Sequence, residues 1–121
     1  MAEDRTRKQY DLEDRTLEFA KAVRAFVNKM PKTSAALEDG RQMIRSSGSI
    51  GANYIEANEA LGKKDFLMRI KICRKEAKES RYWLELVDVA DDAGRAKDRA
   101  VLQQEARELM NIFGAILRKC E

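Results

Sequence analysis

Apolar residues in this chain recur at alternating spacings of four and three residues over four long segments. The first segment carries the pattern at Leu12, Thr16, Phe19, Val23, Phe26 and Met30. The third carries it at Phe66, Ile70, Cys73, Ala77, Ser80, Leu84 and Val87, and the fourth at Leu102, Ala106, Leu109, Phe113, Ile116 and Cys120. An α-helix has about 3.6 residues per turn, so this spacing lines one side chain per turn along a single face. A strand would alternate apolar and polar residues, and no segment does so. The spacing therefore predicts an all-α chain.

The four predicted helices span about residues 11–30, 33–61, 65–92 and 96–119. Asp11 and Asp65 are predicted N-caps of the first and third helices. Pro31 should stop the first helix, and Gly94 should end the third as a C-terminal glycine. Because the connections are short, consecutive helices should run antiparallel. The fold class predicted is an antiparallel up-down-up-down four-helix bundle.

A length of 121 residues fits one domain. Residues 10–121 are predicted to form the bundle. The stretch 1–9 is polar and lacks an apolar stripe, so it is predicted to be a flexible N-terminal tail.

The second segment has little bulk on its predicted core stripe. That stripe runs through Leu37, Gly40, Ile44, Ser47, Gly51, Tyr54, Asn58 and Leu61. A glycine inside a helix costs about 1 kcal/mol relative to alanine, so Gly48 and Gly51 together can break the helix. The alternative is a continuous helix that a facing helix approaches closely, and we favour that interpretation.

The sequence contains no histidine. This excludes Ser–His and Cys–His nucleophile pairs and histidine metal sites. Two pairs of carboxylates stand three residues apart, Glu56 with Glu59 and Glu76 with Glu79. Di-metal bundles use Glu-x-x-His, so an all-carboxylate metal site is the weaker interpretation. We expect no enzymatic activity, no catalytic residue, no metal, no cofactor and no small-molecule substrate.

Two cysteines, Cys73 and Cys120, lack the spacing of a metal site. Cys73 falls on an apolar stripe, where a reduced thiol is expected in a cytosolic protein. No apolar run reaches the roughly 18 residues of a membrane span, and the N-terminus has no apolar region typical of a secretory signal. The sequence predicts cytoplasmic localisation and no membrane partner.

Basic residues gather on the outer face of the third predicted helix. At about 100° per residue, the side opposite its core stripe carries Lys64, Lys71, Arg74, Lys75 and Lys78. This surface is either a solvated helix face or a nucleic-acid-binding stripe that contacts phosphates. No aromatic residue interleaves these basic residues, so any binding would read backbone or shape. The net charge of +3 does not decide between the two.

Further along the same outer face the residues become apolar. Tyr82, Leu86 and Val89 fall near the angle of the basic stripe, and Trp83 lies on a flank. A solvated helix gains nothing from apolar residues there, and exposed apolar surface of this size marks an interface. We expect self-association through this surface. The alternative is that the N-terminal tail or a loop covers it.

The second helix carries polar residues away from its core stripe. They are Arg41, Arg45, Ser49, Asn53 and Glu56. These residues either lie on a solvated surface without a specific role or make polar contacts to a neighbouring subunit or helix. Asn53 and Glu56 are included with the apolar residues in the predicted oligomer interface.

One motif spans the second and third helices. It reads Ser-Ile-x-x-Asn-x-x-Glu-Ala and then Lys-Glu-Ala-x-Glu-Ser-x-Tyr-Trp-Leu, carried by Ser49, Ile50, Asn53, Glu56, Ala57, Lys75, Glu76, Ala77, Glu79, Ser80, Tyr82, Trp83 and Leu84. It resembles the signature of small four-helix bundle proteins found in intervening sequences of bacterial 23S ribosomal RNA genes. The resemblance implies an up-down bundle and, for related members, a ring-shaped homopentamer. It also implies kinship with accessory proteins of diversity-generating retroelements, which bind nucleic acid and a reverse transcriptase through basic surfaces.

Two functions follow from these patterns. The first is a non-enzymatic, homopentameric bundle that binds RNA or a reverse-transcriptase-type nucleoprotein partner through its basic surface. The alternative is an oligomeric scaffold or protein-interaction module that binds no nucleic acid. Salt-dependent RNA binding separates the two.

Overall fold

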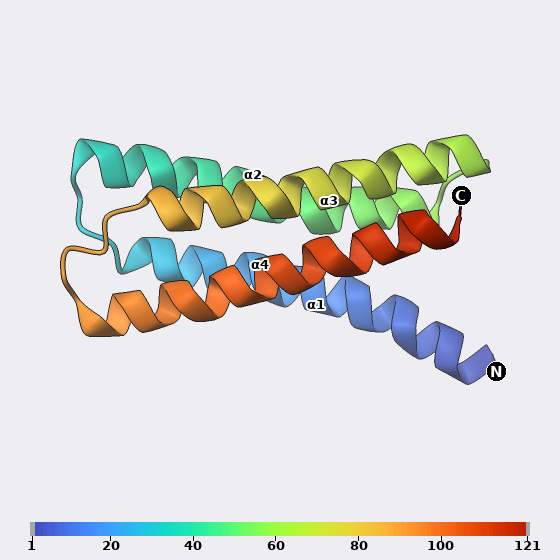
Figure 1. Cartoon of the computed structure of the whole chain (residues 1–121), viewed down its shortest axis with the longest axis horizontal. Coiled ribbons are helices and arrows are strands. Elements are labelled where there is room, and N and C mark those ends of the chain that lie inside the picture. Colours follow the sequence, from blue (N-terminus) through green and yellow to red (C-terminus); the bar gives the residue numbers. More distant parts are fainter. Residues whose placement is uncertain (1, 121) are drawn as a thin grey trace.

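The computed structural model describes the backbone of residues 2–120 and the side chains from residue 12 to residue 120. Within that range it contains four helices and no strand. They are α1 (Ala2–Asn28), α2 (Ser34–Asn58), α3 (Lys63–Leu86) and α4 (Ala93–Lys119). Consecutive helices run antiparallel along one another (Figure 1). The predicted all-α up-down bundle is confirmed.

The four helices do not pack equally. α3 packs extensively against both α2 and α4, and α1 packs well against α2. The contact between α1 and α4, which closes the bundle, is much the sparsest of the four. The bundle is therefore tight around α3 and loose along the side where the first and last helices meet.

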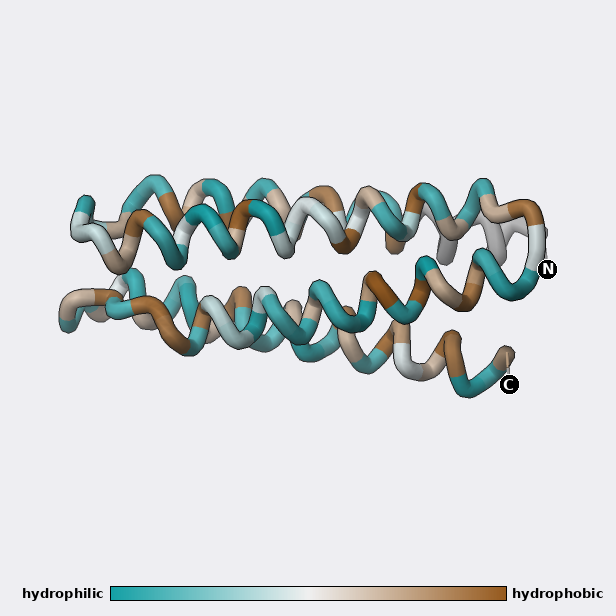
Figure 2. The backbone as a smooth tube through the Cα atoms, turned by 90° about the horizontal axis from the view of Figure 1, so that it is seen from above, coloured by the Kyte–Doolittle hydropathy of each residue, from teal (hydrophilic) through white to brown (hydrophobic). Residues whose placement is uncertain are grey.

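Hydrophobic and hydrophilic residues alternate along each helix (Figure 2). The buried hydrophobic residues of all four helices form one shared core. The largest fully buried residues include Phe113, Met43, Ile50, Ile70, Leu84 and Leu109. Each such side chain contributes about 1.5–3 kcal/mol on burial. The stripes predicted for α1, α3 and α4 face this core. Cys73 lies there as a free thiol, and burial raises its pKa to about 12, which keeps it protonated and unreactive.

α2 runs without a break through Gly48 and Gly51, as predicted, but its buried stripe differs from the predicted one. Leu37 is about half exposed and Leu61 is fully exposed. The buried positions are Ala36, Gly40, Met43, Ser46, Ser47, Ile50, Tyr54 and Ala57. The stripe is rotated because α1 lies close to the small residues. A Cβ at Gly40 would come within 2.8 Å of Val27 Cγ1.

The third connection also differs from the prediction. α3 ends at Leu86 and not near residue 92, because the backbone becomes extended at Val87. Ala90 and Asp91 then adopt positive φ angles of 56° and 55° and turn the chain back. Gly94 lies inside α4 and does not end α3.

The caps follow from these boundaries. Asp92 is the N-cap of α4, because its side chain accepts a hydrogen bond from the backbone N of Arg95 at 2.9 Å. Asp65 does not cap α3, whose N-cap is Gly62. Asp65 lies in the first turn instead, where its negative charge interacts favourably with the positive end of the helix dipole.

α1 begins at Ala2, so Asp11 lies within the helix and does not cap it. The predicted start was wrong because residues 2–10 carry no apolar stripe to mark them as helical. The first turns of α1 diverge from the other three helices (Figure 1). The flexibility of residues 1–9 stays a prediction, and Met1 lies outside the described residues.

Candidate nucleic-acid and oligomerisation surfaces

All five basic residues predicted to bind nucleic acid are exposed. They are Lys64, Lys71, Arg74, Lys75 and Lys78. None of them forms an ion pair with a carboxylate in the part of the chain that the structure describes. Their charges are therefore available to an anionic partner.

A glycine on the neighbouring helix extends this basic surface. A Cβ at Gly114 of α4 would lie 3.4 Å from Arg118 Nη1 and 3.9 Å from Arg74 Nε. Two guanidinium groups from different helices thus converge over a position that has no side chain. Like charges repel each other, so the convergence of these two guanidinium groups favours an anion between them.

The antiparallel register of α3 and α4 adds further basic residues. Gln103 of α4 donates a hydrogen bond to Glu85 of α3, and Gly114 lies beside Arg74. The same register places Arg107 opposite Arg81. We call the resulting surface the α3–α4 basic seam, formed by Lys71, Arg74, Lys78, Arg81, Arg107 and Arg118. Sequence reasoning missed Arg107 and Arg118 because it treated each helix separately. It missed Arg81 because this residue lies at the edge of the predicted basic stripe and is only partly exposed. The basic residues of α4 were a signal, but only the register aligns them with α3.

The predicted apolar surface is partly present. Tyr82 and Leu86 are 59% and 52% exposed, on the outer side of α3. Trp83 is half-buried, packs edge-on against Tyr82, and has a buried Nε1 without a partner among the described residues. Val89 is buried in the core, so its predicted exposure was wrong. α3 ends before Val89, and the helical wheel does not extend to it.

Asn53 makes its polar contacts within the chain. Its Oδ1 accepts a hydrogen bond from Arg69 Nη1 of α3 at 3.0 Å. Its Nδ2 donates to the backbone oxygen of Ser49 at 2.9 Å. The contact predicted to a neighbouring subunit or helix is thus made to a neighbouring helix. Glu56 is exposed. A role for these two residues in an oligomer interface stays a prediction.

A buried carboxylate joins α2 to α3. Glu76 is only 6% exposed, and its Oε2 lies 3.4 Å from Arg45 Nη1. Burial, and then the neighbouring Glu79, raise the pKa of Glu76, while Arg45 opposes this rise. Nearby, the Ser80 hydroxyl donates to Ser46 Oγ at 2.9 Å, which requires the two helix backbones to lie close together.

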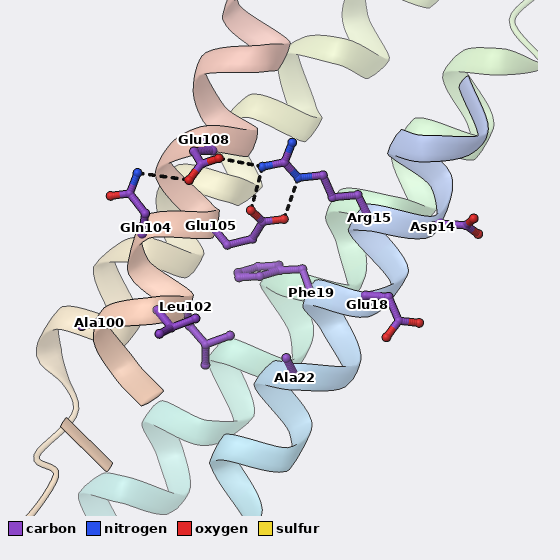
Figure 3. A pocket seen from close by; sticks show the side chains of 11 residues that line it. Asp14, Arg15, Glu18, Phe19, Ala22, Ala100, Leu102, Gln104, Glu105 and Glu108 are labelled. Atoms are coloured by element: carbon purple, nitrogen blue, oxygen red, sulfur yellow. Dashed lines mark hydrogen bonds and ion pairs between the residues drawn. The ribbon is translucent and has the colours of Figure 1, made fainter. Parts of the chain in front are cut away.

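An open groove of about 840 Å³ lies between α1 and α4. Figure 3 shows its lining: Phe19 and Leu102 form an apolar floor, and Ala22 and Ala100 are too small to close the gap. At one end Arg15 reaches across from α1. It donates from Nε to Glu105 Oε2 at 2.7 Å.

The contacts of Arg15 shift the pKa values of charged groups in this groove. Arg15 also donates from Nη2 to Glu108 Oε1 at 3.0 Å. Its pKa lies above the usual value, chiefly because of the hydrogen bond to Glu105. Hydrogen bonds from Gln104 and then Arg15 hold the pKa of Glu108 below its usual value. These hydrogen bonds therefore favour the charged form of the Glu108 carboxylate.

The sequence from residue 8 to residue 115 matches the family described as 23S rRNA-intervening sequence protein. This chain belongs to that family. A solved structure from Bacteroides thetaiotaomicron VPI-5482, described as a protein with unknown function from the S23 ribosomal protein family, resembles it with a TM-score of 0.72. The two share 29% identity over 88% of this chain and 97% of that chain. No curated protein matches this chain.

In this member of the 23S rRNA-intervening sequence protein family, much of the motif serves packing. Glu76 and Ser80 contact α2, and Asn53 contacts α3. The family inferred from the motif is confirmed, whereas the kinship with retroelement accessory proteins stays a prediction. The basic seam lies on a different side of α3 from these contacts.

Among the described residues, no three acidic, cysteine or histidine side chains cluster closely enough to hold a metal ion. Within residues 2–120, no helix is both long and apolar enough to cross a membrane.

Proposed function

We propose that this bundle self-associates and binds RNA through the α3–α4 basic seam. The observation that carries the RNA half is the convergence of Arg74 and Arg118 over Gly114. A phosphate between two guanidinium groups would relieve their repulsion and accept paired hydrogen bonds from each. The family description, 23S rRNA-intervening sequence protein, supports RNA as the nucleic acid.

The seam suits backbone contacts. Its cations carry no internal ion pair among the described residues, so binding would release counterions from the phosphates without breaking salt bridges. From Lys71 to Arg81 it extends about 15 Å at 1.5 Å per residue. In the described part of the chain, no exposed aromatic residue lies between its cations, so base stacking is not built into the seam. The proposed mode is phosphate contact with little sequence preference.

A salt titration of RNA binding tests this function. Arg74→Glu combined with Arg118→Glu should weaken binding to a labelled RNA by about tenfold or more, through lost charge-assisted contacts. The slope of log affinity against log salt should fall by about 1.4 to 1.8 for two lost phosphate contacts.

The matched control is Lys32→Glu combined with Lys97→Glu. Both residues are exposed and lie outside the seam, and the change in net charge is the same. This control should reduce binding far less than the seam variant. Equal losses in the two variants would contradict a localised site and leave only a general charge effect. A reverse-transcriptase-type nucleoprotein partner would use the same surface and stays a prediction.

The second candidate function is an oligomeric scaffold that binds no nucleic acid. The exposed Tyr82 and Leu86 favour it, because apolar side chains on an outer helix face are better buried by a partner. The resemblance implies five copies. The scaffold function predicts self-association, measured by light scattering or native mass spectrometry, together with no salt-dependent RNA binding.

A further inference from the structure

The contact between α1 and α4 is the sparsest in the bundle and leaves an open, largely apolar groove. Phe19 and Leu102 at its base are already buried, whereas Val101, also in the lining, is 62% exposed although it is aliphatic. Leaving such surface in water costs about 25 cal/mol for each Å². An occupant with apolar side chains would therefore be stabilised here.

The rim of the groove selects the charge of that occupant. Four carboxylates line it, those of Asp14, Glu18, Glu105 and Glu108. The one cation of the lining, Arg15, is already bound by Glu105 and Glu108. Glu18 pairs with Lys21 at 3.6 Å, so Asp14 is the carboxylate of the lining that has no ion pair among the described residues. Its apolar floor and acidic rim fit a segment that is both apolar and cationic.

The outer face of α3 has this chemistry. Tyr82 and Leu86 are exposed apolar side chains one turn apart. Lys78 and Lys75 lie one and two turns before Tyr82 on the same side, and both are exposed without a described ion pair. Among the described residues, the Cα atoms of α3 and α1 nowhere come within 8 Å of one another, and this face points away from the bundle. It cannot reach the groove of its own chain.

We infer that the α1–α4 groove of one protomer receives the outer face of α3 of a second copy. Tyr82 and Leu86 lie on the apolar floor, and Lys75 and Lys78 lie opposite the rim carboxylates. The inference rests on the self-association part of the proposed function and names its two surfaces. It does not depend on RNA binding, but Lys78 belongs both to the α3–α4 basic seam and to this α3 face, so RNA and a second copy would compete for that one side chain.

The two surfaces differ, so the contact is heterologous. Each protomer keeps a free groove at one end of a complex and a free α3 face at the other. Repetition closes a ring if the rotation between neighbours allows it and otherwise gives a filament. A heterologous contact also has a signature that a symmetric dimer lacks: two different defective variants can complement each other.

The experiment uses one variant of each surface. Ala22→Arg with Val101→Arg blocks the groove, and Tyr82→Ser with Leu86→Glu disables the α3 face. All four positions are exposed, so the bundle should fold, which circular dichroism checks. Each variant alone should be monomeric by native mass spectrometry. Mixed, they should form a one-to-one heterodimer and nothing larger, because only one intact groove and one intact face remain.

The control is Leu37→Glu, an exposed apolar residue on α2 that belongs to neither surface. It should leave the mass of the assembly unchanged. Association of either double variant alone, or no heterodimer in the mixture, overturns the inference. If wild-type protein associates in those cases, self-association survives and only the named surfaces are wrong. A monomeric wild-type protein at all accessible concentrations would reject self-association itself.

Charge reversal gives an independent check that does not alter the apolar residues. Glu18→Lys should weaken association by about tenfold, since it places a cation opposite Lys75 and Lys78. Lys78→Glu in the same chain should recover part of that loss. Absence of recovery, with each single variant folded, counts against the proposed alignment.

Discussion

The α2–α3 contact and the α1–α4 contact are both seams between antiparallel helices, but they are built differently. At the first, small residues let the backbones approach, and Ser46 and Ser80 meet at 2.9 Å in the core. At the second, Ala22 and Ala100 leave a groove, and Arg15 holds the helices together through Glu105. Close packing fixes the bundle on one side. On the other, loose packing leaves surface for a partner.

The largest difference should appear when bulk is added to each seam. Ser46→Leu makes the side chain at this fully buried position about twice as large, and overpacking should lower the free energy of unfolding by about 1–3 kcal/mol or more. Ala100→Leu adds bulk at the open groove and should change it by less than about 0.5 kcal/mol. Urea denaturation measures both. Equal losses would contradict the difference in packing.

A smaller difference should appear when each seam loses its arginine. Arg45→Met leaves the buried Glu76 without its cation and should cost about 1–2 kcal/mol. Arg15→Met leaves Glu105 without its cation, but the side chain of Glu105 is 27% exposed and that of Glu76 only 7%, so water can solvate Glu105 and the cost should be about 0.5–1 kcal/mol. Thermal and urea unfolding at low salt give the two values. A larger cost at Arg15 would mean that the ion pairs of Arg15 with Glu105 and Glu108, and not packing, hold α1 against α4.

The smallest effect is in the pH dependence of stability. Glu76 at the α2–α3 contact and Glu108 at the α1–α4 contact should change the free energy of unfolding with pH in opposite directions. Burial raises the pKa of Glu76 above 4.5, so the folded state binds this proton more tightly and stability falls as pH rises from about 4.5 through the raised pKa. The pKa of Glu108 is lowered, so its contribution is present above 4.5 and is lost as pH falls through the lowered pKa.

Substitution separates these two contributions. Glu76→Gln should flatten the pH dependence above pH 4.5 and leave stability at neutral pH equal or higher. Glu108→Gln should flatten it below pH 4.5. Urea unfolding between about pH 3 and pH 8, a range that extends to both sides of the ordinary pKa of a glutamate, measures both effects. The same sign in both variants would rule out opposite environments for the two carboxylates.

The sequence predicted the fold well and the surfaces incompletely. The stripes of α1, α3 and α4 were right because bulky residues such as Phe19, Ile70 and Leu109 repeat at helical spacing. The predicted stripe of α2 was rotated relative to the buried one. The prediction assumed that the large apolar residues Leu37 and Leu61 are buried, but no neighbouring helix covers them in the described part of the bundle. The exposed lysines of α3 were found, but Arg107 and Arg118 were not.

Helical periodicity is a local property, so the sequence by itself determined the number of helices, their order and most of their inward faces. It also carried the family motif. The tertiary structure alone decided which helices approach closely, where α3 ends and which residues of different helices meet. Arg74 and Arg118 are 44 positions apart, and the α1–α4 groove joins the two ends of the chain. Such neighbours depend on the register and distance between helices, which interhelical packing sets and no single helix encodes.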